Sequence, residues 1–359
     1  MKKKLIIFLP SFSDGGAEEI LINIANHLYE KYTIIFVINK NFGKKKKLLN
    51  KNIKLIILNK KRLFFCFFLM KDILKDIKPD CVFTTLAHSN LFFCWLKFFS
   101  SLDFNLVIRE TNIFSKKNLS ILKIFNLYFF QILKFLFYNN ANYVLAINEY
   151  SKKQLFKLGI RKEKLVVINN PIIPHNFCLS KKKIFKEKTI MYLGRLVRHK
   201  NIDQIIINFC SILKSNKNIK LYILGTGSEK SNLIKLVKKL NLHDKVKFLG
   251  YIQNPQKYIA NSHLIVSYSD FEGQPNSIIQ AAALNKFILM KEYNGLLHIF
   301  KKQKNIKIFN FFEKQDTQLF IQKALNKKIK ILKNKKITGI FSIKKNIINY
   351  EKLFFSQEK

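Results

Sequence analysis

The sequence predicts an α/β protein made of two Rossmann-like, doubly wound domains that face each other across a cleft. Three observations lead to this fold class. Short β-rich runs alternate with longer segments of helical periodicity, as a parallel sheet with crossover helices requires. The alternation stops at a polar segment with prolines and then begins again. The 359 residues are enough for two cores of ordinary size.

The first domain is expected over residues 1–171. Its strand candidates are short runs rich in Ile, Val, Leu, Phe or Tyr, and a helical stretch separates nearly every pair of them. The candidates are Lys4–Leu9, Thr33–Ile38, Ile53–Leu58, Cys81–Thr85, Leu106–Ile108, Tyr143–Ile147 and Leu165–Ile168. Because consecutive parallel strands need such crossovers, this order predicts a parallel sheet.

A linker is expected over 172–188, since the segment from Pro171 onward carries two prolines and a polar run without clear periodicity. The second domain, 189–345, repeats the alternation of the first. Its strand candidates are Thr189–Leu193, Lys220–Leu224, Val246–Leu249, Leu264–Ser267 and Phe287–Met290. The last stretch, 346–359, is expected to form a helix that packs back on the first domain. Ligands of such sheets bind at the carboxyl ends of the strands, which here predicts a site in the cleft.

The formal charge of +43, from 65 Lys and Arg against 22 Asp and Glu, has two explanations. Codon drift in an AT-rich genome enriches Lys, Ile, Asn and Phe together, and we assign about half of the excess to it. An anionic partner explains the rest. Nucleic acid is disfavoured as that partner, because the chain has no recognisable recognition helix or single-strand stacking module. An anionic membrane surface is the expected partner.

The cysteines predict neither a disulfide framework nor a zinc site, since they are odd in number, widely spaced and never form a Cys-x-x-Cys pair. They are Cys66, Cys81, Cys94, Cys178 and Cys210. The basic start Met1–Lys4 precedes an apolar run of only Leu5–Leu9, and no small-residue cleavage site follows. This run is therefore interpreted as a first strand, and the chain is expected to be cytoplasmic.

The Phe-rich stretch Leu119–Tyr138 approaches the length of a membrane span. Lys123, Asn126, Gln131 and Lys134 interrupt it, and a spanning helix should carry few or no charges, so we do not expect it to cross a membrane. Two interpretations remain open. A crossover helix buried on the sheet is favoured over an interfacial helix in contact with a membrane.

Two loops in the sequence combine glycines or cations with the end of a predicted strand. Gly15 and Gly16 lie between the first strand and the helix that follows, where the backbone can turn tightly and N–H groups can face an anion. A solely structural turn would have the same sequence. Gly194 precedes Arg195 and Lys200, which are five residues apart and can converge on a pair of phosphates. Two such cations could take the place of a metal ion.

Two more loops of this kind follow in the second domain. The first contains Gly225 and Gly227, in a turn that frees backbone near a nucleotide. The second runs from Ser267 to Ala281 and combines a carboxylate, a Gly-Pro turn and a helix start whose N–H groups can face a diphosphate. Its candidate ligand-binding residues are Glu272 for sugar hydroxyls, Gly273, Asn276 and Ser277 at the turn and helix start, and Gln280 for a ribose.

The order of these motifs resembles the retaining glycosyltransferases of family 4, which have the two-domain GT-B architecture. The resemblance covers nearly the whole chain. It rests on Gly-Gly-Ala-Glu at 15–18, Asn170-Pro171, Gly194-Arg195-Leu196 with Lys200, Gly225-x-Gly227, Phe248-Leu249-Gly250 and Ser-x-x-Glu-Gly-x-Pro at 269–275. It implies a bacterial hexosyltransferase that moves a hexose or N-acetylhexosamine from a UDP- or GDP-linked donor to a lipid-linked, lipopolysaccharide or capsule glycan. The family's chemical step needs no bound metal and no cofactor.

The resemblance also implies roles for individual residues. Arg195 and Lys200 would bind the donor's diphosphate and stabilise the charge of the leaving group, which is the largest expected effect. Gly16 would approach the phosphates from the first domain, and Glu272 would hold the transferred sugar. Such enzymes line the acceptor side of the cleft with first-domain residues, and here these are His88, Arg109 and Asn112. A helix cap or a surface position is the alternative for His88.

The sequence departs from the family pattern after Glu272. The family has a second Glu eight residues later, followed by a Gly and a Pro, whereas this chain has Gln280, Asn285 and Phe287. Gln can still hydrogen-bond a ribose through a neutral group. These departures leave a second hypothesis open, in which a degenerate GT-B protein binds a nucleotide sugar or a partner transferase without catalysis. For the active enzyme, the expected location is the inner face of the plasma membrane, in cell-surface polysaccharide synthesis.

Overall fold

The computed structural model describes residues 2–13, 15–111, 121–174, 177, 184–292, 295–300, 303–309, 314–329 and 332–355. The chain divides into two compact units. Unit 1 comprises Met1–Ile172 together with Phe341–Lys359, and unit 2 comprises Ile173–Ile340. Asn112 lies outside the described residues, as do residues 175–176 and 178–183 of the predicted linker.

Unit 1 is built on a seven-stranded parallel sheet in the order β3-β2-β1-β4-β5-β6-β7. The strands are β1 (Lys4–Leu9), β2 (Thr33–Ile38), β3 (Lys54–Ile57), β4 (Cys81–Thr85), β5 (Asn105–Glu110), β6 (Tyr143–Ala146) and β7 (Leu165–Val167). The interior strand β1 is fully buried from Leu5 to Leu9, because helices cover both faces of the sheet. Its uninterrupted apolar run follows from this double burial.

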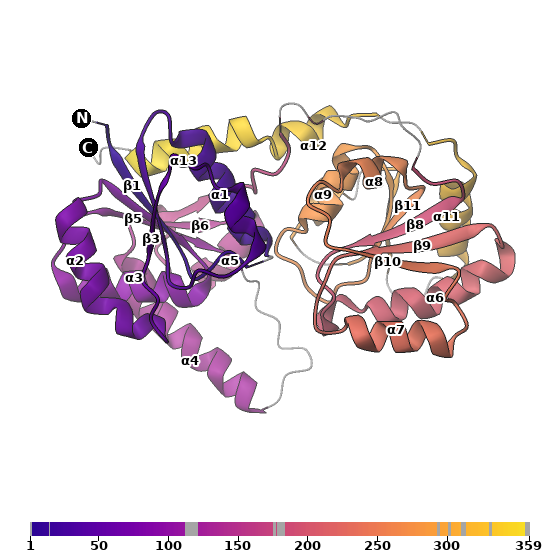
Figure 1. Ribbon diagram of the computed structural model, residues 1–359, viewed down its shortest axis with the longest axis horizontal. Helices are drawn as coiled ribbons and strands as arrows, with labels where there is room; N and C mark the ends of the chain where they lie inside the picture. Colours follow the sequence, from indigo (N-terminus) through magenta and orange to yellow (C-terminus); the bar gives the residue numbers. More distant parts are fainter. Residues whose placement is uncertain are drawn as a thin grey trace. The chain divides into compact units, whose positions relative to one another are not determined.

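The helices of unit 1 lie on both faces of its sheet (Figure 1). They are α1 (Gly16–Leu28), α2 (Phe67–Ile77), α3 (Ala87–Ser100), α4 (Ile121–Phe137), α5 (Glu149–Lys157) and α13 (Ile343–Phe355). The chain's last helix, α13, packs on β4 through Tyr350 and Phe354, whose rings lie 5.6 and 4.9 Å from that of Phe83. Asn105 Nδ2 donates to Leu353 O at 2.7 Å. These contacts fasten the end of the chain to the first unit.

Unit 2 contains a six-stranded parallel sheet in the order β10-β9-β8-β11-β12-β13. The strands are β8 (Lys188–Leu193), β9 (Ile219–Leu224), β10 (Val246–Gly250), β11 (Leu264–Ser267), β12 (Phe287–Lys291) and β13 (Ile306–Phe309). The helices are α6 (Ile202–Ser215), α7 (Lys230–Lys239), α8 (Gln256–Asn261), α9 (Asn276–Ala283), α10 (Leu297–Phe300), α11 (Lys314–Asn326) and α12 (Lys335–Ile340). The predicted fold class, with two doubly wound α/β halves, is confirmed.

Helix α4 differs from the favoured expectation of a buried crossover helix. Lys134 is buried and contacts the sheet, but Phe129, Ile132, Phe135 and Leu136 are each more than half exposed. One side of the helix therefore packs and the other faces solvent. Across the part of the chain that the structure describes, no helix combines the length and the apolar character needed to cross a bilayer.

Candidate functional site

The strand order of unit 2 reverses at β8 and β11. From β8 the chain moves outward to β9 and β10, and it then returns to place β11 on the other side of β8, with Leu264 paired to Ile190. The crossovers on the two sides of such a switch point diverge and leave a crevice at the carboxyl ends of the two strands. The loops that begin at Gly194 and Tyr268 leave from these two ends.

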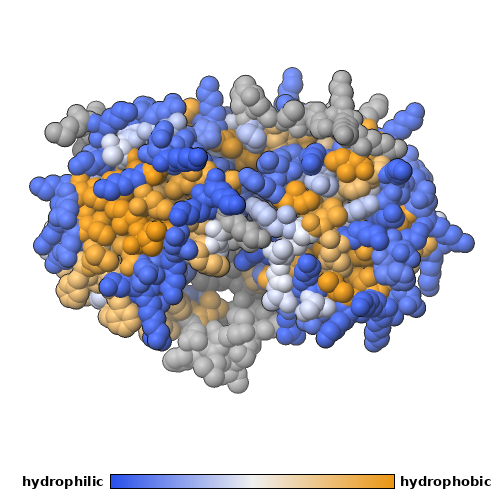
Figure 2. Space-filling model, in the orientation of Figure 1, coloured by the Kyte–Doolittle hydropathy of each residue, from blue (hydrophilic) through white to orange (hydrophobic). Residues whose placement is uncertain are grey.

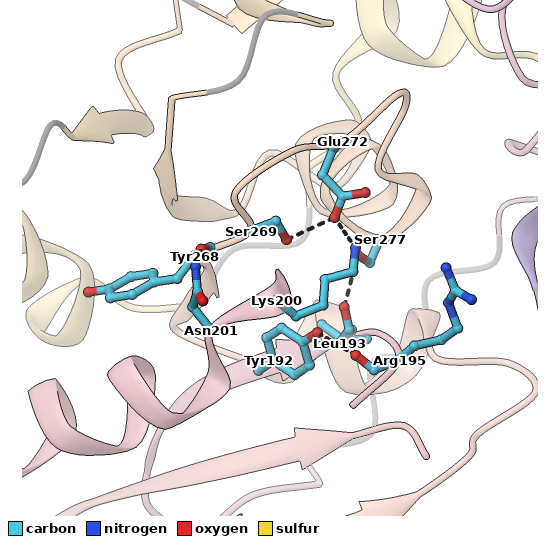
Figure 3. A network of polar contacts seen from close by, with 9 residues as sticks. All are labelled: Tyr192, Leu193, Arg195, Lys200, Asn201, Tyr268, Ser269, Glu272 and Ser277. Carbon is cyan, nitrogen blue, oxygen red and sulfur yellow. Dashed lines mark hydrogen bonds and ion pairs between the residues drawn. The ribbon is translucent and has the colours of Figure 1, made fainter. Parts of the chain in front are cut away.

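An ion pair joins the two loops, between the Lys200 ammonium and the Glu272 carboxylate. Their side chains are 12% and 15% exposed, so the pair is shielded but open on one side. The Ser269 hydroxyl donates to Glu272 Oε1 at 2.9 Å and holds the carboxylate in place (Figure 3). The structure thus brings together the carboxylate expected to hold a sugar and one of the cations expected to hold a diphosphate.

Further hydrogen bonds join the same two loops next to the Lys200–Glu272 pair, and an ion pair joins one of these loops to β12. Asn201, in a left-handed conformation with φ of 49°, donates from Nδ2 to Tyr268 O at 3.0 Å and to Asp270 Oδ1 at 2.9 Å. Lys291, at the end of β12, forms an ion pair with the same Asp270 oxygen at 2.6 Å. The sequence alone does not single out Asn201, Asp270 or Lys291. The role of Asn201 could have been predicted from the sequence, since Asn tolerates the left-handed region and this one directly precedes a helix.

Arg195 lies on the same loop but points elsewhere. In Figure 3 its side chain extends away from the Lys200–Glu272 pair, and its guanidinium makes no hydrogen bond or ion pair within the described residues. The backbone of this loop is fixed by the Tyr192 hydroxyl, which donates to Arg195 O at 3.1 Å. Burial first, and then the nearby Glu272 carboxylate, raise the pKa of Tyr192, so the hydroxyl keeps its proton for this bond.

The glycines after β8 and β9 pack against one another. Gly225 has φ of +137°, and a Cβ there would lie 1.9 Å from Gly194 O. A Cβ at Gly227 would lie 2.2 Å from Leu196 O. The backbone bonds Gly194 N to Leu224 O and Leu196 N to Thr226 O, of 3.0 and 2.8 Å, join the two loops. The close packing of these two loops is enough to require glycine at positions 225 and 227. The expected approach to a nucleotide is a second explanation.

Helix α9 begins at the same edge of the sheet. Asn276 is its first residue, and the Ser277 hydroxyl donates to Leu193 O at 3.1 Å, which ties the helix start to the end of β8. Gly273 lies in the turn before it, and Gln280 is partly exposed one turn further along the helix. The positive end of the helix dipole therefore lies beside the loop that carries Lys200.

The departures at Asn285 and Phe287 lie at the opposite edge of the sheet. Phe287 begins β12 and pairs with Leu264 at the start of β11, whereas the site follows the other end of β11. Asn285 has φ of +51°, a conformation that Gly adopts freely and Asn tolerates best among other residues. The Phe287 ring packs 5.5 Å from that of Phe320. These two residues therefore have local structural roles away from the site.

Unit 1 has its own switch point, between β1 and β4. Gly15 and Gly16 follow β1, and His88 lies in the first turn of α3, after β4. A Cβ at Gly15 would lie 2.1 Å from Glu18 Oε2, because the Glu18 side chain folds back over the loop and accepts from Ser13 Oγ. His88 is an exposed residue, yet desolvation by its neighbours lowers its pKa against the opposing effect of Glu110.

Arg109 does not face solvent as the acceptor-side expectation requires. It is 1% exposed, and its guanidinium donates to Asn170 Oδ1 and, at 3.4 Å, to Thr85 Oγ1. Its role in this structure is internal, because the strand β5 on which it lies is covered on both faces. A sequence shows that an Arg ends a strand but not that neighbouring side chains will enclose it. Asn112 lies outside the described residues.

Two family models match the chain, one for each half. The model described as Glycosyltransferase Family 4 matches residues 14–176, and the model described as Glycosyl transferases group 1 matches residues 179–338. Together they cover every strand of the two sheets except β1.

Two relatives named as glycosyltransferases are similar to the chain in sequence, and a solved structure is similar to it in fold. An uncharacterized glycosyltransferase of Methanocaldococcus jannaschii is 30% identical over 234 residues, which are 59% of this chain and 55% of that protein. The Campylobacter jejuni N-acetylgalactosamine-N,N'-diacetylbacillosaminyl-diphospho-undecaprenol 4-alpha-N-acetylgalactosaminyltransferase is 27% identical over 82% of each chain. The crystal structure of Anabaena HepE in complex with UDP-glucose superposes with a TM-score of 0.80 at 18% identity, over 99% of this chain and 100% of that chain.

Proposed function

The chain belongs to the glycosyltransferases of family 4 and group 1, and from this premise we propose that it is a retaining, metal-independent hexosyltransferase. The donor is a nucleotide diphosphate sugar, linked to UDP or GDP, and the transferred group is a hexose or N-acetylhexosamine. The acceptor is a lipid-linked, lipopolysaccharide or capsule glycan. No cofactor takes part.

The observation that carries this proposal is the pairing of Lys200 and Glu272 at the β8–β11 switch point. A sugar diphosphate presents hydroxyls at one end and a doubly charged diphosphate at the other, and the site offers a carboxylate for the first and cations for the second. Arg195, which is exposed on the same loop, can add a second, bidentate contact to the phosphates. The positive end of α9 adds to the same field.

In the proposed reaction, the bond between the anomeric carbon and the diphosphate oxygen breaks, and a bond from that carbon to an acceptor hydroxyl oxygen forms on the same face. The hydroxyl proton leaves with the nucleoside diphosphate, whose oxygen becomes more negative as the bond lengthens. Lys200, Arg195 and the α9 amides stabilise that developing charge. Gly15 and Gly16 of unit 1 are proposed to approach the phosphates, and His88 is proposed to contact the acceptor or the donor sugar.

Two observations support a membrane-borne acceptor. The Campylobacter relative is named for an acceptor glycan that is linked to undecaprenol through a diphosphate. The net charge of +43 also favours an anionic surface. We therefore place the enzyme at the inner face of a bacterial plasma membrane, where such carriers are elongated.

The direct test is transfer from a panel of UDP- and GDP-linked sugars to a polyprenyl-diphosphate glycan. Released nucleoside diphosphate and the glycosylated product are both measured, and the anomeric configuration of the new linkage is assigned by NMR. We expect the product to keep the donor's configuration, and we expect EDTA to leave the rate unchanged. An inverted linkage or a rate that requires added divalent metal would refute those parts of the proposal.

The competing function, a donor-binding protein without catalysis, now rests mainly on Gln280. Asn285 and Phe287 lie at the far edge of the sheet and do not bear on the site. A single-turnover experiment separates the two functions. A bound donor that releases no nucleoside diphosphate in the presence of acceptor would favour the non-catalytic protein.

A further inference from the structure

An exposed apolar surface covers one side of unit 1. Its members lie on α2 and the short 3-10 turn before it, on α3 and on α4, and we call it the aromatic face. They are Phe64, Phe65, Phe68, Leu69, Phe98, Phe99, Tyr128, Phe129, Phe130, Ile132, Phe135 and Leu136. Phe68 is 77% exposed and Phe64 is 65% exposed. Figure 2 shows apolar surface bordered by hydrophilic residues on the side of unit 1 where α2 and α3 lie.

Ring contacts connect the 3-10 turn before α2 with α3 and with the last residue of α4, Phe137. Trp95 of α3 lies 5.5 Å from Phe64 and 5.5 Å from Phe99, measured between ring centroids. Phe99 contacts Phe98 at 4.8 Å, and Phe98 reaches Phe137 of α4 at 6.0 Å. A connected aromatic surface of this kind marks an interaction site rather than scattered exposed residues.

A buried ion pair fixes which side of α4 faces outward. Lys134 Nζ lies 2.8 Å from Glu110 Oε2, with side chains 2% and 1% exposed, and the Tyr138 hydroxyl donates to the same oxygen at 2.8 Å. Rolling the helix to bury Phe129 and Phe135 would break this pair and leave a buried charge without its partner. The aromatic face is therefore held outward by the fold.

The border of the aromatic face carries basic side chains. Lys60, Lys61 and Arg62 are exposed directly before the 3-10 turn that begins at Leu63, and Lys75 and Lys78 are exposed on and after α2. Exposed Asp72 and Asp76 lie among them, so the border is mixed, with an excess of cations. Aromatic rings beside Lys and Arg are typical of proteins that lie in the interface of a bilayer.

We propose that the aromatic face inserts into the headgroup region of an anionic bilayer, with Phe64, Phe68 and Phe98 among the inserted rings. A lipid surface is favoured over a protein partner. The long, flexible side chains of Lys and Arg around the exposed Phe rings can reach the anionic headgroups while the rings insert below them. This inference deepens the proposed function, since it assigns the surface by which an enzyme with a membrane-borne acceptor reaches it.

Trp95 allows a direct measurement, because it is the chain's one tryptophan and lies within the ring network. Full-length protein is mixed with vesicles of phosphatidylcholine and phosphatidylglycerol, or of phosphatidylcholine alone, with and without lipids brominated on their acyl chains. We expect tryptophan emission to shift to shorter wavelength and to be quenched by brominated lipid only in the anionic vesicles. Binding to anionic vesicles with no quenching by brominated lipid would overturn the assignment of this face.

Variants test the same face by co-sedimentation. Phe68→Ser with Phe98→Ser should weaken partition into anionic vesicles by about tenfold or more, since two exposed rings lose their burial. The matched control replaces exposed apolar residues of unit 2, Leu319→Ser with Ile207→Ser, and should partition like wild type. Equal partition of all three proteins would overturn the proposal.

Two further outcomes keep this inference separate from the proposed reaction. Lys200→Ala, a variant of the donor site, should partition like wild type, so a failure to detect transfer would leave the membrane result standing.

Sedimentation equilibrium without lipid tests a second copy of the chain as the occupant. A dimer that the Phe68→Ser and Phe98→Ser variant abolishes would overturn the bilayer assignment, whereas a monomer at all concentrations would support it.

Discussion

The Lys200 ammonium forms an ion pair with the Glu272 carboxylate, and the Ser269 hydroxyl binds the same carboxylate oxygen at 2.9 Å. A diphosphate that uses Lys200 must therefore compete with Glu272 for it. The two residues lie 72 positions apart in the chain, and the parallel order of β8 and β11 brings them together. Under the proposed function, this contact sets how the site divides its charge between the donor's phosphates and its sugar.

Glu272→Gln should separate nucleotide binding from transfer. The neutral amide competes less for Lys200, so the free nucleoside diphosphate should bind more tightly by about threefold to tenfold, on the order of 1 kcal/mol. Transfer should fall by about 100-fold, since the sugar loses its carboxylate acceptor. Calorimetry and steady-state kinetics measure the two effects. Weaker binding of the nucleoside diphosphate to this variant would show that Lys200 and Glu272 do not compete.

Gln280 is expected to act through a neutral hydrogen bond to the donor's ribose. Gln280→Ala removes that bond and should weaken donor binding by about tenfold, while Gln280→Glu should keep affinity within about threefold because a carboxylate can accept the same hydroxyls. Titration of the nucleotide sugar measures both. If Gln280→Ala binds the donor like wild type, this residue does not contact the donor.

Gly225→Ala should damage the loop contact at the site. The new Cβ would lie 1.9 Å from Gly194 O, and φ of +137° is strained for any residue with a side chain. We expect a loss of stability of about 2 kcal/mol or more together with weaker donor binding. The matched control is Gly250→Ala, which has φ of +72° but no atom within 4 Å. If thermal unfolding shows that Gly250→Ala lowers the stability more than Gly225→Ala does, the loop contact at Gly225 does not have the importance given to it here.

Lys286 should destabilise unit 2 near neutral pH. Burial lowers its pKa to about 8 from 10.5, so the folded state holds a charged ammonium unfavourably at pH 7. The unfolded chain binds more protons between about pH 8 and 10.5, and stability therefore rises with pH across that window. Lys286→Met should raise the unfolding temperature at pH 7, although it removes the 2.9 Å hydrogen bond from Lys286 Nζ to Ala260 O. This gain in unfolding temperature should become smaller by pH 10. A gain that grows with pH would contradict this assignment.

Much of the fold could be predicted because strands buried on both faces leave continuous apolar runs. The strands from Lys4 and from Leu264 were predicted with the bounds that the structure has. β13 (Ile306–Phe309) was missed, since it is an edge strand, half exposed and interrupted by Lys307. Helix α4 was misjudged because the pattern cannot show which of its many apolar residues the sheet has room to cover.

Candidate site residues could be predicted where a motif follows the end of a strand. They could not be predicted where contacts between distant parts of the chain determine which side chains meet. Lys200 and Glu272 were singled out, but their direct pairing follows from the β8–β11 register, which no local pattern specifies. Asp270 and Lys291 were missed because a charged residue near a strand end is common in a chain this basic. Arg109 was misplaced as an acceptor contact because its burial depends on distant residues such as Asn170.

The most direct test of the central claim compares donor binding by wild type and by variants of the β8 loop. Arg195→Ala should weaken binding of the nucleotide diphosphate sugar by about tenfold or more, because a charge-assisted contact to phosphate is lost. Arg198→Ala, an exposed cation three residues further along the same loop, should stay within about twofold of wild type. Calorimetric titration that shows this difference supports a diphosphate site at the carboxyl ends of β8 and β11. Equal affinity of all three proteins would contradict it.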